Sequence, residues 1–266
     1  MNNLEAIQAL IATHGADLAL VVNHSGGKDS QRMLGYLREQ FPGVTTYVVM
    51  ADTGFEHKGA IEWTRQQAAR YELPLHVVRN PNKTYLEMVE RRGMFPSAST
   101  RQCTSDLKRG PVQKFIRSLR EKVIVNCTGI RAEESAARAK QTAWKHSEQM
   151  SKNGRLVYDW MPIFELTLAD VLEWHWASNQ PLHPVYVDEY HRDGSAGGYL
   201  RRFSCRVCIF ATDADLRAIH QNDREAFDLV ASLEQRIGFT MRAGKSLFDI
   251  IQPQATSSCG ENLSLF

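Results

Sequence analysis

The sequence predicts an α/β fold with a parallel sheet of five strands, helices on both faces and a helical extension at the C-terminus. Three observations support this prediction. Short apolar, β-branched runs alternate with segments of helical periodicity. Several of the runs end in a turn that contains glycine. Repeated strand-helix-strand order implies parallel strands that are joined by right-handed crossovers.

The five expected strands follow from the apolar runs, and the expected helices fill the gaps between them. Tyr85–Arg92 has helical periodicity, and Leu166–Trp176 does too, with Thr167 as its N-cap. Asp215–Phe239 predicts two further helices. The strands are expected at Leu18–Val22, Val44–Met50, Leu75–Val78, Val123–Val125 and Val157–Ile163.

Length and composition limit the class of protein. The 266 residues are enough for one large α/β domain with a small appendage. Hydrophobic residues make up 43% of the chain, and no apolar run is long enough to span a bilayer. The N-terminal segment has an early acidic residue and no basic region, which predicts an amphipathic helix and not a signal peptide. We therefore expect a cytoplasmic protein with no membrane partner.

Charge and cysteine content indicate chemistry more than structure. The net charge of +2 is too small to predict nucleic-acid binding, although residues 101–140 are locally basic. Five cysteines in a chain of cytoplasmic character argue against a disulfide framework. They favour metal or redox chemistry instead.

The chain is organised around residues 21–30, VVNHSGGKDS, which predict a strand, a glycine turn and the start of a helix. Such a turn leaves the first helical amides unpaired at the positive end of the helix dipole, where anions bind. We therefore expect a phosphate-binding loop. Its residues are Ser25, Gly26, Gly27, Lys28, Asp29 and Ser30.

Each residue type in this loop suits phosphate. The glycines allow close backbone approach, the serines offer hydroxyls, and Lys28 supplies a positive charge. Asp29 would orient Lys28 or hold a magnesium ion. An ordinary capped strand-to-helix turn explains the glycines but not the lysine beside them. The pattern is not the Walker loop, whose first glycine lies four residues before its Gly-Lys pair.

Two further strand ends should meet this loop, because ligands bind beyond the carboxyl ends of parallel strands. Asp52 follows the second strand and would hold magnesium or a ribose hydroxyl, or would cap the next helix. Gly129 and Arg131 follow the fourth strand, and Arg131 should face the phosphates. Residues 144–154 are polar and aperiodic, which predicts a mobile loop near the site.

Three cysteines are candidate metal ligands. Cys103 is expected in a polar, basic loop, where Arg101 and Lys108 should lower its pKa. Cys205 and Cys208 have a spacing that presents two thiolates to one metal or cluster. Zinc and a [4Fe-4S] cluster both remain open from spacing alone. Cys127 adjoins an apolar strand and is expected to pack in the core.

These segments together resemble the phosphoadenosine phosphosulfate (PAPS) reductase family of the ATP pyrophosphatase (PP-loop) superfamily. The resemblance covers roughly residues 17–210. It rests on six motifs: SGGKDS at 25–30, DTGFE at 52–56, RQCTSDLK at 101–108, GIRAEESAARA at 129–139, MPIF at 161–164 and CRVCIF at 205–210.

The resemblance implies a Rossmann-like, adenine nucleotide alpha hydrolase-like domain at 1–210 and a helical extension and tail at 211–266. It implies an enzyme that splits ATP between its α and β phosphates and adenylylates a substrate, with magnesium. Lys28, Asp29 and Arg131 would then be catalytic. The implied nucleotide-binding residues are Ser25, Gly26, Gly27, Lys28, Asp29, Ser30, Asp52, Gly129 and Arg131.

Within the family, the chain is most similar in its motifs to enzymes of DNA phosphorothioation and tRNA thiolation. Those enzymes keep the ATP-type loop and carry three cysteines placed like Cys103, Cys205 and Cys208, commonly on a [4Fe-4S] cluster. Cluster-bearing reductases usually have two adjacent cysteines at the first position, whereas Cys103 follows Gln102. Cys259 resembles the reductases' C-terminal nucleophile, or is a tail cysteine without a role.

The expected function is therefore an ATP-dependent sulfurtransferase. Its partners would be ATP, a nucleic acid (DNA or tRNA) as substrate and a sulfur-donor protein, and the oligomeric state is open. A phosphoadenylyl-sulfate or adenylyl-sulfate reductase is the alternative enzyme. A nucleotide-binding regulatory or accessory subunit of a modification system is the non-enzymatic alternative.

Overall fold

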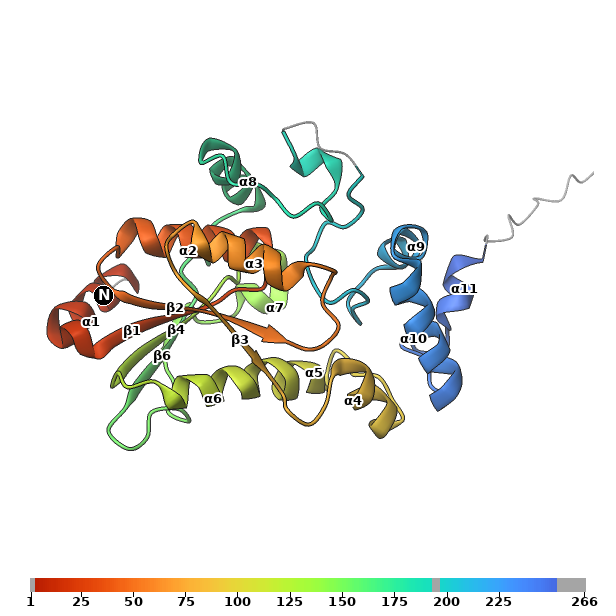
Figure 1. Ribbon diagram of the computed structural model, residues 1–266, viewed down its shortest axis with the longest axis horizontal. Helices are drawn as coiled ribbons and strands as arrows, with labels where there is room; N and C mark the ends of the chain where they lie inside the picture. The colour runs from red at the N-terminus through yellow and green to blue at the C-terminus, as the bar shows by residue number, and fades with distance from the viewer. Residues whose placement is uncertain (1–2, 193–196, 253–266) are drawn as a thin grey trace, which may run out of the picture.

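A computed structural model describes residues 3–192 and 197–252 of the chain. Its centre is a single mixed sheet of the order β3-β2-β1-β4-β6-β5 (Figure 1). The strands are β1 (Leu18–Asn23), β2 (Thr45–Asp52), β3 (Leu75–Arg79), β4 (Val123–Thr128), β5 (Trp144–His146) and β6 (Leu156–Trp160). The first five members of this order run parallel, and β5 is antiparallel to β6 at one edge. The predicted α/β fold with five parallel strands is confirmed.

The sixth strand corrects the prediction of a mobile loop at residues 144–154. Trp144 stacks on Tyr158, with ring centroids 5.3 Å apart, and meets Trp160 edge-on at 5.8 Å. This aromatic packing across the sheet holds Trp144–His146 in β5. A three-residue strand leaves no periodicity to detect in the sequence.

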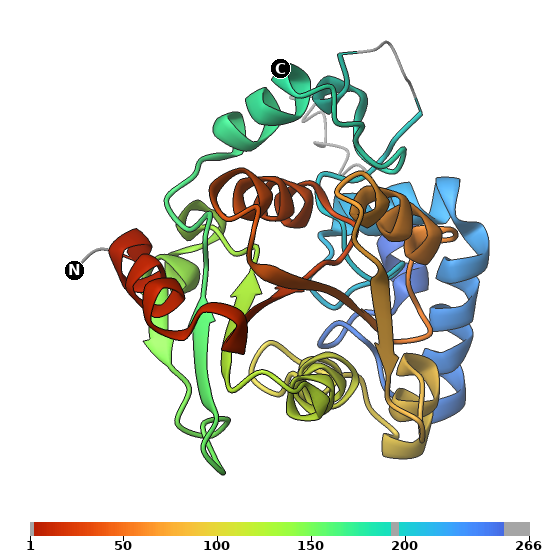
Figure 2. The same cartoon turned by 60° about the vertical axis from the view of Figure 1, so that its left-hand side comes forward.

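Helices cover both faces of the sheet. Figure 1 and Figure 2 show α2, α3 and α8 on one face and α6 on the other. No helix in the described part of the chain is long and apolar enough to cross a membrane. The helices are α1 (Asn3–His14), α2 (Lys28–Gln40), α3 (Ala60–Ala69), α4 (Tyr85–Arg92), α5 (Gln102–Thr104), α6 (Gly110–Ser118), α7 (Ala136–Ala139), α8 (Leu168–Ala177), α9 (Asp213–Asn222), α10 (Arg224–Ile237) and α11 (Leu247–Ile251). Short 3-10 turns are η1 (Gly15–Asp17), η3 (Ala132–Glu134) and η4 (Asp188–Tyr190).

The segment from α5 to α6 is helical throughout, interrupted by a π-helical turn, η2 (Ser105–Arg109). Cys103 therefore lies in a helix, and its expected place in a loop was wrong. Single π-turns inside helices occur often at functional sites. Here the turn brings Lys108 and Arg109 to the wall of the main pocket.

The α6 face of the sheet changes character along its strands. Ala19, Val21 and Ile124 pack against Val112 and Ile116 of α6. Two residues further along the same strands lie polar side chains: Asn23 follows Val21, Asn126 follows Ile124, and Asp159 follows Val157. The sheet is thus filled with apolar side chains at the amino ends of its strands and is polar at their carboxyl ends.

The C-terminal helices α9, α10 and α11 share one hydrophobic cluster with the sheet domain. Phe55, Tyr85 and Leu107 on one side pack with Phe227 and Val230 of α10 on the other. The cluster therefore crosses residue 210, where the sequence predicts a boundary. The division of the chain into a nucleotide-binding domain at 1–210 and a helical extension at 211–266 stays a prediction.

Candidate functional site

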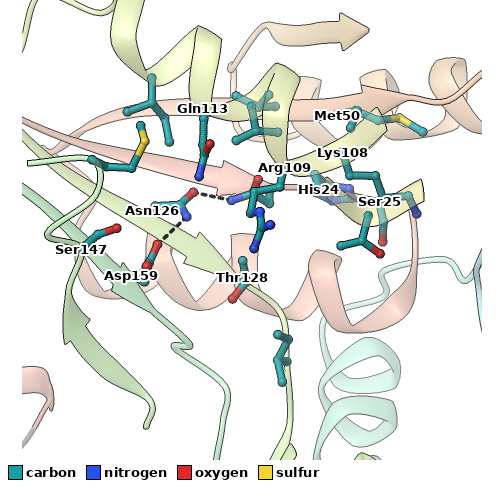
Figure 3. A pocket seen from close by; sticks show the side chains of 18 of the residues that line it. His24, Ser25, Met50, Lys108, Arg109, Gln113, Asn126, Thr128, Ser147 and Asp159 are labelled. Carbon is teal, nitrogen blue, oxygen red and sulfur yellow. Dashed lines mark hydrogen bonds between the residues drawn. The ribbon is translucent and has the colours of Figure 1, made fainter. Parts of the chain in front are cut away.

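A cavity of about 720 Å³ lies at the carboxyl ends of the central strands, on the α6 side (Figure 3). Its volume is typical of small-molecule sites. Ser25 of the glycine loop, Lys108 and Arg109 of η2, and Cys205 all line it. One pocket therefore joins the predicted phosphate loop to one of the predicted metal ligands.

The glycine loop has the predicted strand-turn-helix form, with α2 beginning at Lys28. Gly26 adopts φ +85°, a left-handed conformation that favours glycine. The Gly26 amide donates to Nδ1 of His24 at 3.0 Å, and the Lys28 amide donates to the Tyr186 hydroxyl at 2.9 Å. Phe203 covers the loop closely: a Cβ added to Gly27 would lie 3.0 Å from the Cβ of Phe203. The chain after α8 thus folds over the loop.

Lys28, Asp29 and Arg131, the three predicted catalytic residues, form one chain of ion pairs. Lys28 Nζ lies 3.2 Å from Asp29 Oδ2, and Arg131 Nε lies 2.7 Å from Asp29 Oδ1. Burial would raise the pKa of Asp29, but the charges of Lys28 and Arg131 outweigh it and hold this pKa below its usual value. The Lys28 ammonium is buried near the Tyr186 and Tyr190 rings, and none of the three residues lines the pocket.

Gly129 lies against the backbone of the glycine loop, and this contact gives a testable prediction. A Cβ at position 129 would lie 3.1 Å from the carbonyl oxygen of Asp29 and 3.2 Å from Cα of Ser30. Because backbone atoms cannot rotate away, Gly129→Ala should lower the free energy of unfolding by about 1–3 kcal/mol. Urea denaturation measures this. Gly43→Ala is the matched control, since nothing lies within 4 Å of its added Cβ. Equal stability of the two variants would contradict the close approach.

Asp52 caps its turn and also binds an arginine. Its Oδ1 accepts from the Gly54 amide and its Oδ2 from Arg79, both at 2.8 Å. Burial would raise the pKa of Asp52, but these hydrogen bonds outweigh it and keep the pKa below its usual value. Asp52 does not line the pocket. Asp52 thus holds the turn at Gly54, but it does not cap the next helix, α3, whose N-cap is Gly59, so that expectation was wrong. Magnesium or ribose binding stays a prediction.

Cys103, Cys205 and Cys208 converge from α5 and from the turn after residue 204. All three are half-buried, have free thiols and pack on the cluster that contains Tyr85. All three also interact electrostatically with the ammonium of Lys108. The three thiols thus lie near one another, and Cys205 lines the pocket at the carboxyl edge; their role as metal ligands stays a prediction.

The expected lowering of the Cys103 pKa was wrong. Burial raises the pKa of Cys103, and Lys108 and Arg101 offset this effect only in part. Burial likewise raises the pKa of Cys205. The sequence showed the basic neighbours but not the depth of the thiols.

Three thiols are a donor type that binds zinc or an iron-sulfur cluster. The half-buried cation Lys108, which interacts electrostatically with all three, would offset the charge of bound thiolates. The buried hydroxyl of Tyr85 beside them has no hydrogen-bond partner in the described residues. Within residues 3–192 and 197–252, no three His, Cys, Asp or Glu side chains are grouped to hold a single metal ion.

The other two cysteines are distinct from this set. Cys127 is fully buried in β4, as expected, and burial raises its pKa far above the usual value. Cys259 lies outside the described residues.

A polar row in the pocket floor is absent from the sequence prediction. It consists of Asn23, Asn126 and Asp159, from β1, β4 and β6. Figure 3 shows Asn126 beside Asp159. A signal was present in the sequence, because each residue interrupts an otherwise apolar strand near its carboxyl end. Glu56 and Lys108 also line the pocket. Neither side chain was predicted as a site residue, although Asp52 and Cys103 in the same two motifs were.

The sequence model of the phosphoadenosine phosphosulfate reductase domain family matches residues 19–197. The chain belongs to this family. The match includes the glycine loop, Asp52, Gly129 and Arg131, and it ends before Cys205.

Individual relatives are distant. An uncharacterized protein of Methanocaldococcus jannaschii is 25% identical over 221 residues, 83% of this chain and 49% of that protein. The chain thus spans about half the length of that relative. The mouse (Mus musculus) cytoplasmic tRNA 2-thiolation protein 1 is 42% identical over 82 residues, which cover 28% of this chain and 19% of that protein. The U34-tRNA thiolase NcsA of Methanococcus maripaludis, solved with its [4Fe-4S] cluster, aligns with a TM-score of 0.48 at 14% identity, over 97% of this chain and 82% of that one.

Buried histidines near the loop of this PAPS reductase-family chain predict a pH dependence. Burial lowers the pKa of His24 to about 3 and that of His57 and His183 to about 4, from an ordinary 6.5. Unfolding therefore takes up protons between pH 6.5 and 4, so stability should fall as the pH falls through this window. Urea denaturation at pH 7, 5.5 and 4.5 measures the slope. His57→Gln should reduce it, and an unchanged slope in this variant would contradict the neutral, buried imidazole.

A buried ion pair fixes the cysteine turn to the C-terminal helices. Arg206, between Cys205 and Cys208, donates from Nε and Nη2 to both oxygens of Asp223 at 2.8 and 2.5 Å, and from Nη2 to Glu225 at 3.1 Å. The side chains of the Arg206–Asp223 pair are only 9% and 15% exposed.

Asp223→Asn should therefore lower the free energy of unfolding by about 3 kcal/mol, because it removes the main partner of a buried guanidinium. Chemical denaturation measures the loss. Asp228→Asn is the neighbouring control: it breaks an exposed pair with Arg224 on the same helix, which should cost less than about 0.5 kcal/mol. An equal loss of unfolding free energy in the two variants would show that the buried Arg206–Asp223 pair stabilises the fold no more than the exposed pair does.

Proposed function

We propose that this chain is an ATP-dependent enzyme that adenylylates a substrate with release of pyrophosphate and supports sulfur transfer, with a nucleic acid as acceptor. The observation that carries the proposal is the shared pocket. Ser25 of the intact SGGKDS loop and Cys205 of the three-cysteine set line the same cavity. Phosphate chemistry and sulfur chemistry would thus take place within one site.

The loop would hold the departing pyrophosphate. The N-terminus of α2 would direct the positive end of its dipole at the phosphates, and fixed positive charge of this kind stabilises charge that develops in phosphoryl transfer. Lys28 would offset the charge on the pyrophosphate, and Arg131 would steady the α-phosphate. Ser25, Gly26, Gly27, Ser30 and Gly129 would complete the nucleotide-binding set.

Magnesium and a [4Fe-4S] cluster are the proposed cofactors. Asp29 or Asp52 would hold the magnesium ion, which neutralises phosphate charge. Cys103, Cys205 and Cys208 would hold the cluster, with zinc as the alternative. A cluster with three protein thiolates supplies one open iron at which sulfur binds. Lys108 would offset the thiolate charge from within the pocket wall.

The sulfur-transfer branch is supported by the 82-residue similarity to a tRNA 2-thiolation protein and by the ATP-type loop. A phosphoadenylyl-sulfate or adenylyl-sulfate reductase is the second candidate, because the matching family model carries that name. A regulatory subunit would need a nucleotide site but not three converging thiols. We therefore place the sulfurtransferase first.

Mass spectrometry of nucleosides from cells with and without the gene tests the branch. A sulfur-containing nucleoside that disappears with the gene, and returns with the wild-type chain but not with Cys205→Ala, is the expected result. Purified protein should in parallel leave phosphoadenylyl sulfate and adenylyl sulfate unreduced in the presence of a thiol reductant. Reduction of either compound, with no change in nucleosides, would favour the reductase instead.

A further inference from the structure

Asn23, Asn126 and Asp159 form a continuous hydrogen-bonded row across three adjacent strands in the pocket floor (Figure 3). Asn23 Nδ2 donates to Asn126 Oδ1 at 2.7 Å, and Asn126 Nδ2 donates to Asp159 Oδ1 at 2.8 Å. Asn126 and Asp159 also face each other in the β4–β6 register. No step of the proposed phosphate or sulfur chemistry uses this row.

The direction of every hydrogen bond in the row is fixed by its two ends. At one end, Asn23 Nδ2 also donates to the carbonyl oxygen of Cys127 at 2.8 Å, so this atom is the amide nitrogen. At the other end, the carboxylate of Asp159 only accepts. Asn126 must therefore turn its oxygen to Asn23 and its nitrogen to Asp159.

This fixed direction leaves two unused hydrogen-bonding positions side by side. Asp159 Oδ2 accepts no hydrogen bond from the described residues, and its nearest cation, Lys145 Nζ, lies 4.0 Å away. Asn126 Nδ2 has a second hydrogen that no described residue accepts. The Asp159 side chain is 31% exposed, so Oδ2 is open to the cavity that it lines. The floor thus offers an acceptor beside a donor.

We propose that the Asn126–Asp159 pair reads the amino edge of a nucleobase, accepting from its exocyclic amino group and donating to the adjacent ring nitrogen. Adenine and cytosine carry this edge, whereas hypoxanthine and uracil present a carbonyl oxygen beside a ring N–H. A carbonyl oxygen opposite the Asp159 carboxylate would place two acceptors together. The inference rests on the proposed function, because it assumes that the pocket binds a nucleotide.

The same edge has two sources, the adenine of ATP or the base of the acceptor. Isothermal titration separates them. In the first arm, ATP and inosine triphosphate are titrated into the protein. In the second, AMP, IMP, CMP and UMP are titrated in the presence of a saturating, non-hydrolysable ATP analogue. We expect the amino base to bind at least about tenfold more tightly than the oxo base in one arm.

Asp159→Asn should abolish this preference. Asn126 Nδ2 still requires an acceptor, so the new amide turns its oxygen to Asn126 and presents its nitrogen at the former position of Oδ2. The pocket then offers two donors side by side, so each edge meets one matched and one opposed position: the amino group opposes the new amide nitrogen, and the ring N–H of the oxo base opposes Asn126 Nδ2. The amino base should therefore lose its advantage over the oxo base. Lys145→Gln is the control, since it removes the nearby charge but leaves the carboxylate and should keep the wild-type preference.

The arms distinguish the two claims. Discrimination in the first arm assigns the pair to ATP, and discrimination only in the second assigns it to the acceptor. ATP binding with no amino preference in either arm, or an amino preference that Asp159→Asn leaves unchanged, would overturn the inference and leave the proposed function intact. No binding of ATP to the wild-type chain would overturn the proposed function. The affinities of the four monophosphates would then test recognition of the base edge by the Asn126–Asp159 pair on their own.

Discussion

Lys28→Ala should lower pyrophosphate release from ATP by at least about a hundredfold, the usual loss when one fixed donor is removed from a charged transition state. Lys28 is the cation at the start of α2, and its ammonium lies 3.2 Å from Asp29. Without it, Asp29 keeps Arg131 as its partner, so the fold should survive while the loop loses positive charge. Pyrophosphate release from labelled ATP, with magnesium and candidate nucleic acids, measures the effect.

Lys58→Ala is the matched control for this substitution. Lys58 pairs with Glu225 at 2.6 Å, and its side chain is 76% exposed. Its removal should leave pyrophosphate release unchanged. Circular dichroism of both variants confirms that each is folded. Equal activity of wild type and Lys28→Ala would show that Lys28 has no part in the reaction.

Single alanine substitutions of Cys103, Cys205 or Cys208 should each remove the bound cluster. Anaerobically purified wild-type protein is expected to be brown, with about four irons per chain. Three thiolates are the minimum that anchors such a cluster with one open iron, so the loss of any one should bleach the protein. Iron and sulfide analysis with visible spectroscopy measures this.

Cys127→Ala and Cys259→Ala are the controls for the cysteine series. Cys127 is fully buried in β4, apart from the converging thiols. Both variants should stay brown. Colourless wild-type protein with one zinc per chain would contradict the cluster. Loss of the cluster in Cys259→Ala would show that all four irons have protein ligands.

The sequence predicted the parallel sheet and the strand-turn-helix form of the glycine loop because these depend on local patterns. Apolar runs, glycine turns and helical periodicity each extend over several adjacent residues. Tyr85–Arg92 was predicted with the observed bounds, since Thr84 caps its start and Gly93 ends it in a left-handed conformation. The convergence of Cys103 with Cys205 and Cys208 followed from motif order.

Features that depend on tertiary packing were not predictable in this way. Strand β5 exists because Trp144 stacks on Tyr158, a contact that no local pattern records. The pKa of Cys103 is raised because its thiol is buried, although its sequence neighbours are basic. The ion pair of Asp29 with Arg131 joins residues that lie 102 positions apart in the chain.

The position of bond cleavage in ATP is the most direct measurement of the proposed function. ATP labelled at the γ-phosphate is incubated with wild-type protein, magnesium and nucleic acid from cells that lack the gene, and the products are separated by thin-layer chromatography. We predict labelled pyrophosphate, with the adenylyl group left on the nucleic acid, and release of that group as unlabelled AMP when a sulfide source is added as the displacing nucleophile. Labelled orthophosphate with ADP, or no turnover with any nucleic acid, would contradict cleavage between the α and β phosphates.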